Sequence, residues 1–393
     1  MYFIGDEEIE ALKKLFDRKR FYRYQSTYES ECDLFEAEFS TLFNTNHSIL
    51  LSSGTNALIL ALLSAGIRPG DEVLIPTYTF VATASAVIHA GAIPVLVNIN
   101  SDLSLDIEDA RAKITDKTKA LILVHMDGLV ADIAGATQLC REKSLIFVED
   151  VAQAIGASFE NKRLGTFGDF GCYSLNENKN ITCGEGGILV TSNRTYFEKA
   201  FCLHDGPAQF NPTKKDFFKE IEPFMGLSMR VSEIQGTIMR VQLKRLDHIL
   251  NELRVRKKIF LEQLSHLPSA RVVTGYSAEG DCSSSLHLQF DDPSFGAQVS
   301  KTLREKALLF APITIRPAHA AWKWSHLLGE KSHVQPGLNP YHRTEKSYSY
   351  PTYQYLDSVE ILTKTVKMDI DINKSLSQTE EEARVIRSVI TNG

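Results

Sequence analysis

The chain has 393 residues, a length that allows roughly two or three domains, or one large domain with a smaller companion. Hydrophobic residues make up 43% of it and charged residues 23%, which is the ordinary balance of a globular protein. The net charge of −6 and the lack of a long Lys/Arg block argue against a nucleic-acid partner.

The six cysteines are scattered, with no CxxC pair and no ligand-like spacing to histidine. This pattern argues against a disulfide framework and a metal site, and it favours a reducing compartment. The acidic N-terminus, MYFIGDEE, lacks the apolar segment of a signal peptide, and no apolar run approaches the ~20 residues that span a bilayer. We therefore expect a cytoplasmic protein with no membrane partner.

The first expected element is a helix over residues 8–18, followed from residue 49 by short apolar strands that alternate with helices. This alternation predicts a mainly parallel sheet with helices on both faces. The expected strands are residues 49–51, 72–75, 94–99, 120–125, 145–149 and 188–191, and helices are expected at residues 56–65 and 80–90.

A long helical pattern covers residues 231–264, and the rest of the chain mixes short strands and helices. We place the boundary between two domains inside this pattern. The predicted fold is α/β, with a large domain and N-terminal arm over residues 1–245 and a smaller C-terminal α+β domain over residues 246–393.

Lys179 stands in the segment DFGCYSLNENKNITCGEGG, residues 169–187, between an expected Tyr-Ser turn and a Gly-Glu-Gly-Gly turn that precedes a strand. A lysine presented in this way can form a Schiff base with the aldehyde of pyridoxal 5'-phosphate (PLP). Taken alone, the segment is equally compatible with a surface lysine in a polar loop.

Two turns at strand ends could hold other parts of such a cofactor. The turn SSGTN, residues 52–56, directly precedes a helix, where backbone N–H groups bind phosphate and Gly54 allows a close approach. Phe80 follows the next strand and could stack on a pyridine ring, although it could also pack in the core.

A third segment supplies acids, because the strand at residues 145–149 is followed by Asp150. A carboxylate facing a pyridine nitrogen keeps that nitrogen protonated, which makes the ring a better electron sink. Asp150 is the candidate, and Gln153 could donate to the ring hydroxyl. The acids Glu149 and Asp150 could instead cap a helix. Ser174 could add a hydroxyl to the phosphate site.

In this order, the segments resemble the PLP-dependent sugar aminotransferases of the DegT/DnrJ/StrS group, which have the type I aspartate aminotransferase fold. The resemblance extends over residues 46–247 and is thin in the C-terminal third. The matching stretches are SGTNAL (53–58), GDEV (70–73), TFVAT (79–83), EDVAQA (149–154), Tyr173-Ser174 through Lys179, GEGG (184–187) and GLSMRVSE (226–233).

The resemblance implies a catalytic role for Lys179, which forms the Schiff base and then shuttles the proton. It also implies PLP as the cofactor and a homodimer in which the partner subunit completes each active site. The cofactor-binding residues implied are Gly54, Thr55, Asn56, Ser174 and Ser228 at the phosphate, Phe80 on the ring, Asp150 at the pyridine nitrogen, Gln153 at the ring hydroxyl, and Lys179.

Two positions depart from the family's pattern. Asn176 stands where the family usually has a histidine, three residues before the lysine, and this departure bears on substrate choice more than on reaction type. Ser228 stands where the family commonly has an asparagine that reaches the phosphate of the other subunit. The partner role of Ser228 is therefore the weakest part of the implied site.

The activity implied is transfer of an amino group from an amino acid, such as L-glutamate, to a keto or aldehyde sugar in cell-surface polysaccharide (including lipopolysaccharide) or natural-product sugar biosynthesis. A narrower resemblance, to transaminases that form 8-amino-3,8-dideoxy-manno-octulosonate, rests on VHMDG (124–128), CYS (172–174), ITCGEGG (181–187) and WKWSH (322–326). Residues 176–178 and much of 206–224 do not match that subgroup.

Other readings stay open at this point. The acceptor could be a nucleotide-linked 4-keto or 3-keto sugar or a cyclitol, and a regulatory protein could bind PLP without turnover. Sugar dehydratases of this fold replace the lysine with histidine, so Lys179 argues against them. A nicotinamide enzyme would need GxGxxG opening its first helix, which this chain lacks.

A few further residues could contact the substrate. Arg230 could bind a substrate carboxylate or form a structural salt bridge. His125 and the pair His204 and Asp205 could lie near the cofactor or be structural. Trp322, Trp324 and His326 could form an aromatic wall or pack within the small domain.

Overall fold

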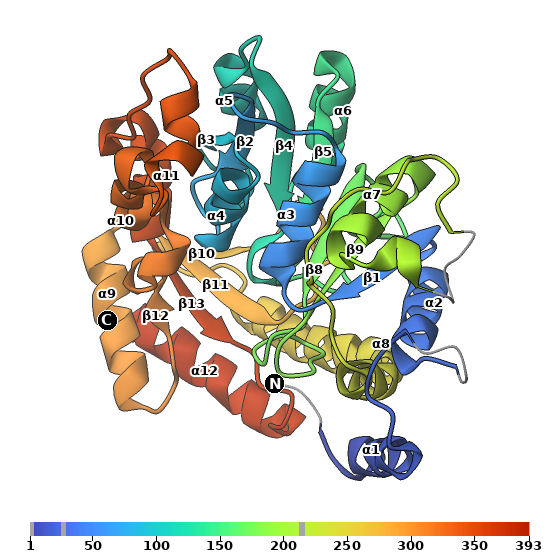
Figure 1. Ribbon diagram of the computed structural model, residues 1–393. Coiled ribbons are helices and arrows are strands. Elements are labelled where there is room, and N and C mark those ends of the chain that lie inside the picture. Colours follow the sequence, from blue (N-terminus) through green and yellow to red (C-terminus); the bar gives the residue numbers. More distant parts are fainter. Residues whose placement is uncertain (1–3, 25–28, 212–216, 393) are drawn as a thin grey trace.

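The computed structural model describes residues 4–24, 29–211 and 217–392 (Figure 1). Its larger sheet has seven strands in the order β1-β9-β8-β5-β4-β2-β3. All neighbours are parallel except β9, which is antiparallel to both β1 and β8. The predicted mainly parallel sheet is confirmed. The strands are β1 (His47–Leu51), β2 (Glu72–Pro76), β3 (Ile93–Val97), β4 (Thr118–Val124), β5 (Ile146–Asp150), β8 (Phe170–Ser174) and β9 (Gly187–Thr191).

Helices cover both faces of this sheet because its strands are apolar on both sides. In β2, Val73 and Ile75 belong to one hydrophobic cluster and Leu74 to another, as the alternation of side chains along a strand requires. Helices α3 (Gly54–Ser64), α4 (Ala82–His89) and α7 (Arg194–His204) cover the first face, and α5 (Ile107–Lys113) and α6 (Ile133–Lys143) cover the other (Figure 1).

The second sheet lies in the C-terminal part and has four antiparallel strands in the order β10-β11-β13-β12. Its strands are β10 (Ala270–Val273), β11 (Ser285–Phe290), β12 (Ala311–Pro312) and β13 (Thr365–Asp369). Helices α9 (Pro293–Glu305), α11 (Leu356–Thr363) and α12 (Leu376–Asn392) accompany it. Between β12 and α11 the chain forms 3-10 turns and the short helix α10 (Ala321–Trp324).

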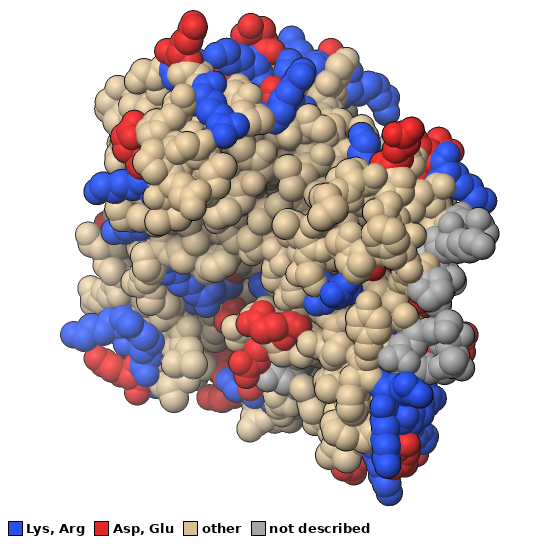
Figure 2. Space-filling model, in the orientation of Figure 1, with Lys and Arg blue, Asp and Glu red and all other residues tan. Residues whose placement is uncertain are grey.

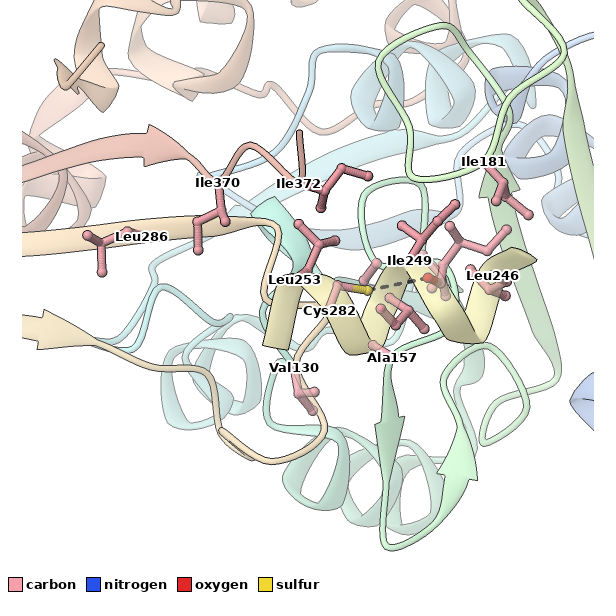
Figure 3. Packing of buried hydrophobic residues seen from close by; sticks show 14 of the residues in the cluster. Val130, Ala157, Ile181, Leu246, Ile249, Leu253, Cys282, Leu286, Ile370 and Ile372 are labelled. Carbon is pink, nitrogen blue, oxygen red and sulfur yellow. Dashed lines mark hydrogen bonds between the residues drawn. The ribbon is translucent and has the colours of Figure 1, made fainter. Parts of the chain in front are cut away.

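The 31-residue helix α8 (Glu233–Gln263) crosses the predicted domain boundary at residue 245. In Figure 3 its residues Leu246, Ile249 and Leu253 lie between Ile181 of the large-sheet side and Ile370 of the small-sheet side. One hydrophobic cluster therefore runs across both parts of the chain. Helices α1 (Asp6–Arg18) and α2 (Glu31–Phe43) also pack on α8.

One local expectation is wrong, and one alternative is not met. Tyr173 and Ser174 do not form a turn but end strand β8, where they pair with Ile188 and Gly187 of β9. The segment after Asp150 is not helical. It consists of turns that lead to the small hairpin β6 (Ser158–Phe159) and β7 (Lys162–Arg163). Among the described residues, no helix combines the length and the apolar character needed to cross a bilayer.

Candidate active site

A cavity of about 650 Å³ lies where the carboxyl ends of the parallel strands face the second sheet. Such an edge is where open α/β sheets bind ligands. Most of the predicted site residues line it, namely Gly54, Thr55, Phe80, Asp150, Gln153, Ser174 and Lys179. Asn56 and Ser228 do not line it within this chain.

Lys179 reaches the cavity from the loop between β8 and β9. Backbone hydrogen bonds close this loop, because the N–H of Glu177 donates to the carbonyl of Gly184 (3.0 Å) and that of Leu175 to Gly186 (2.9 Å). Burial lowers the pKa of Lys179, and the nearby Asp150 carboxylate only partly opposes this effect. A larger fraction of the amine is therefore uncharged and nucleophilic than for a lysine in water.

Asp150 is the last residue of β5, and its side chain is buried at the cavity. Its carboxylate accepts hydrogen bonds from the backbone N–H of Ala152 and from the hydroxyl of Thr83, both at 3.1 Å. Burial raises the pKa of Asp150 despite these two donors. Because no helix follows β5, the helix-capping alternative fails, and the site favours a cationic partner for this carboxylate.

The neighbouring Glu149 has a structural role. Its buried carboxylate accepts the backbone N–H groups of Gly165 (2.7 Å), Phe167 (2.6 Å) and Gly168 (2.8 Å), which fixes the loop before β8. His125 is also buried away from the cavity lining, and its Nδ1 accepts the N–H of Ala131 at 3.1 Å. Of the two acids that the sequence offered, the structure brings only Asp150 into the cavity.

The candidate phosphate site joins two turns that lie far apart in the sequence. A Cβ atom added to Gly54 would lie 3.0 Å from Cβ of Ser174, and one added to Gly187 would lie 2.3 Å from the carbonyl carbon of Ser53. Gly187 is thus required for the turns to meet, and a larger residue at Gly54 would fit only if Ser174 moved. The N-terminus of α3 lies at this junction, since Gly54 and Thr55 line the cavity together with Ser174, and the first N–H groups of a helix favour an anion.

Asn56 contributes to the turn rather than to the cavity wall. Its backbone N–H donates to Oγ of Ser53 (3.1 Å), and its side-chain Nδ2 donates to Oγ of Ser52 (2.9 Å). Asn56 thus holds the SSGTN turn at the start of α3, and its contact with a phosphate stays a prediction.

Phe80 and Gln153 lie on the cavity wall as expected. The Phe80 side chain is half-exposed, and its ring centroid lies 5.2 Å from that of His319. The carboxamide oxygen of Gln153 accepts the backbone N–H of Asp127 at 3.0 Å, so its nitrogen is left as the donor. Asn176, at the position of the family's histidine, donates through Nδ2 to Oε1 of Glu185 at 3.0 Å.

Ser228 is exposed on a segment that pairs with Asp205 through an isolated β-bridge. Its neighbours Phe224, Met225 and Leu227 also expose much of their surface. Within this chain Ser228 has no place in the cavity, so its predicted role would need a second subunit.

The sequence did not single out the cavity wall that the second sheet supplies. Asp127, in the turn after β4, accepts hydrogen bonds from the hydroxyl of Tyr78 (2.5 Å) and from Nε2 of His287 (3.2 Å), and it pairs with Lys367. Burial opposes ionisation of Asp127, but Lys367 and His287 hold its pKa well below the usual range. The sequence signal for Asp127 was the VHMDG motif at residues 124–128, which carried part of the narrower resemblance.

The remaining candidates lie outside the cavity. Arg230 forms an ion pair with the buried Asp205, as the salt-bridge alternative expected, and His204 is buried against Tyr24 at 3.2 Å. Trp324 is buried, and it packs with Trp322 in the hydrophobic core. None of these residues lines the cavity.

The sequence profile of the DegT/DnrJ/EryC1/StrS aminotransferase family matches residues 3–348. The chain is 36% identical over 237 residues to a GDP-perosamine synthase of Vibrio cholerae, covering 60% of this chain and 63% of that protein. It is 35% identical over 245 residues to a UDP-N-acetyl-3-dehydro-alpha-D-glucosamine 3-aminotransferase of Acidithiobacillus ferrooxidans, covering 62% of this chain and 63% of that protein. The chain thus spans less than two thirds of the length of these relatives.

Solved structures share the fold along the whole chain. The crystal structure of 3-amino-5-hydroxybenzoic acid synthase superposes with a TM-score of 0.82 at 22% identity, covering 100% of this chain and 98% of that one. An Escherichia coli GDP-4-keto-6-deoxy-D-mannose-3-dehydratase with bound hydrated PLP superposes with a TM-score of 0.78 at 22% identity, covering 98% and 97%. The predicted type I fold is confirmed, and the chain belongs to the DegT/DnrJ/EryC1/StrS aminotransferase family.

Proposed function

We propose that the protein is a PLP-dependent aminotransferase that moves an amino group from an amino acid to a keto or aldehyde sugar. The observation that supports it most directly is the convergence of Lys179 and the buried Asp150 in one cavity, beside the N-terminus of α3. The family membership agrees with this activity.

The residues present fit PLP. Asp150 is a buried carboxylate with a raised pKa, so a pyridinium nitrogen would stabilise its charged form. The glycine-lined junction of the SSGTN turn with Ser174 leaves room for a phosphate, and Lys179 would hold the aldehyde carbon. Phe80 would cover one face of the ring, and Gln153 would donate to the ring hydroxyl.

PLP, when bound, supplies an electron sink that makes the Cα proton of an amino acid removable. In this scheme the amine of Lys179 takes that proton as a general base, because burial lowers its pKa toward the working range. With PLP bound, Asp150 would keep the pyridine nitrogen protonated. Thr83 and Ala152 orient the Asp150 carboxylate for that contact through their hydrogen bonds.

The amino donor can be tested first, before any acceptor. The absorbance spectrum of the purified protein with PLP would be recorded before and after adding L-glutamate alone. Loss of the yellow band with one equivalent of 2-oxoglutarate per site is the expected result. If the yellow band is unchanged by both L-glutamate and L-glutamine, the alternative of a PLP-binding regulatory protein is favoured.

For the acceptor, we propose an acidic sugar such as the octulosonate of the narrower resemblance. Support comes from the VHMDG motif, because its Asp127 lines the cavity and pairs with Lys367 of the second sheet. Nucleotide-linked keto sugars, which the names of the relatives describe, and cyclitols are the competing substrates. Turnover of the octulosonate aldehyde no faster than that of a nucleotide-linked keto sugar would reject this choice.

We further propose that the protein works as a homodimer. Ser228 lies outside the cavity of its own chain, and exposed apolar side chains surround it. On the face shown in Figure 2, a wide uncharged area lies across the upper middle, with charged side chains near the centre and at the margins. Light scattering of the purified protein tests this proposal, and a monomer that transaminates at full rate would refute it.

A further inference from the structure

Besides Lys179, the cavity has two cationic side chains on the wall that the second sheet supplies. This wall consists of residues that the second sheet and the segment before α10 supply, namely Ser284, Arg316, His319, Lys367 and Asp369. Two of them, Arg316 and Lys367, carry positive charge, and they differ in how completely the protein already satisfies that charge.

Lys367 is fully engaged. Its side chain is only 8% exposed, and its amine contacts two carboxylates, those of Asp127 and of Asp369, the latter at 3.1 Å. Asp127 in turn receives hydrogen bonds from Tyr78 and His287. The positive charge of Lys367 is therefore already matched by two carboxylates, and it offers little attraction for an anionic ligand.

Arg316 is only loosely paired. Its side chain is 42% exposed, and its nitrogens lie 3.9 Å from Oδ1 of Asp127 and 3.5 Å from Oδ2 of Asp369. Both separations exceed the usual length of a charge-assisted hydrogen bond, so the donors of the guanidinium remain available at the cavity.

Backbone hydrogen bonds hold the turn that contains Arg316 beside Phe80, the residue expected to stack on the ring. The N–H of Val81 donates to the carbonyl of Ala318 (2.7 Å), and that of Thr79 donates to the carbonyl of His319 (3.2 Å). Phe80 thus lies between two residues that are tied to the Arg316 turn. His319 adds no charge near neutral pH, because burial lowers its pKa to about 4.

We propose that Arg316 is a specificity-determining residue that binds a carboxylate of the substrate. A guanidinium presents parallel N–H donors that match the two oxygens of a carboxylate. A single carboxylate suits the site better than a diphosphate does, since Asp127 and Asp369 would repel a more highly charged group. The carboxylate belongs to the amino-acid donor or to an acidic sugar, and the inference rests on the proposed aminotransferase activity.

The test compares Arg316→Gln and Arg316→Lys with Arg384→Gln, an exposed arginine on α12 that pairs with Glu381 at 3.0 Å. Glutarate, a dicarboxylate without an amine, is the probe for calorimetric titration of the PLP-loaded protein. We expect Arg316→Gln to weaken glutarate binding on the order of tenfold or more, because a charge-assisted pair is lost. The glutarate affinity of Arg316→Lys should lie between those of Arg316→Gln and the wild type. The affinity of Arg384→Gln should match that of the wild type.

Half-reaction kinetics then identify the source of the carboxylate. A raised half-saturating concentration of L-glutamate in Arg316→Gln, with a smaller change in maximal rate, assigns Arg316 to the donor. A rise confined to an acidic sugar acceptor assigns it to the sugar. If the wild type transaminates but Arg316→Gln binds glutarate as tightly and has the same half-saturating concentrations, the inference about Arg316 is overturned. The proposed function would then still stand. If the wild type does not react with any donor, the proposed function fails, and glutarate binding still decides the role of Arg316.

Discussion

Asp127 and Lys367 form a buried ion pair between the turn after β4 and strand β13 of the second sheet. Both side chains are less than a tenth exposed, and the pair lines the cavity. The contact therefore joins the two sheets at the place where the proposed reaction occurs.

Lys367→Met should destabilise the fold by about 3 kcal/mol, because it leaves the Asp127 carboxylate buried without its cation. Urea unfolding followed by circular dichroism measures the loss. Lys364→Met is the matched control, since Lys364 pairs with Glu360 on the surface and should change the free energy of unfolding by less than about 1 kcal/mol. Equal stability of the two variants would mean that the pair adds nothing to the fold.

Lys179→Ala should abolish the covalent attachment of PLP and slow transamination by about a hundredfold or more, because the variant lacks both the amine and the general base. Borohydride reduction followed by peptide mass spectrometry locates the attachment. Lys119→Ala, at an exposed position, should keep both properties. Reductive labelling of any other lysine in the wild type would contradict the assignment.

Asp150→Asn should slow removal of the donor's Cα proton on the order of a hundredfold, since the ring nitrogen loses the charge that keeps it protonated. The measurement is the rate with L-glutamate deuterated at Cα. A larger isotope effect than that of the wild type would show that proton removal has become limiting. A rate equal to that of the wild type would leave Asp150 with a structural role only.

Stability should fall as the pH drops below about 6.5, before most carboxylates titrate. Burial lowers the pKa of both His204 and His287, so the unfolded chain binds protons that the folded chain excludes. Their contribution is complete above the unfolded pKa of 6.5 and is lost as the pH falls toward the lower folded values. Between pH 7 and pH 5.5 we expect a loss of at most about 1 kcal/mol for each histidine, the limit for a group that takes up its proton only in the unfolded chain.

The contribution of a single histidine can be isolated by difference. His287→Gln should flatten the decline measured by urea unfolding at pH 7.0, 6.0 and 5.5, whereas His326→Gln, at an exposed position, should not. Parallel declines in the wild type and in His287→Gln would show that His287 does not titrate with folding.

The order of strands and helices around the large sheet could be predicted because apolar periodicity and turn residues mark each element locally. Lys179, Asp150 and Gly54 were found in the same way, since each stands at a strand end with a distinctive neighbour. Ser174, whose segment was expected to turn, ends strand β8 and lines the cavity, and its contact with a phosphate stays a prediction.

The wall of the cavity that contains Arg316 and Lys367 could not be predicted. These residues meet Asp127 only through long-range packing of β13 and the turn before α10, and no local pattern marks that approach. For the same reason the sequence left open whether Arg230 binds substrate or forms a salt bridge, and the fold pairs it with Asp205.

Helix α8 constrains how the protein can be divided. Its buried side chains on both sides of residue 245 belong to one cluster that includes Tyr173 near the cavity and Ile386 of the C-terminal helix. We propose residues 1–245 and 246–393 as architectural domains only. A fragment ending at residue 245 would lose Leu246, Ile249 and Leu250 from beneath the lysine loop, so an isolated N-terminal half should aggregate rather than bind cofactor.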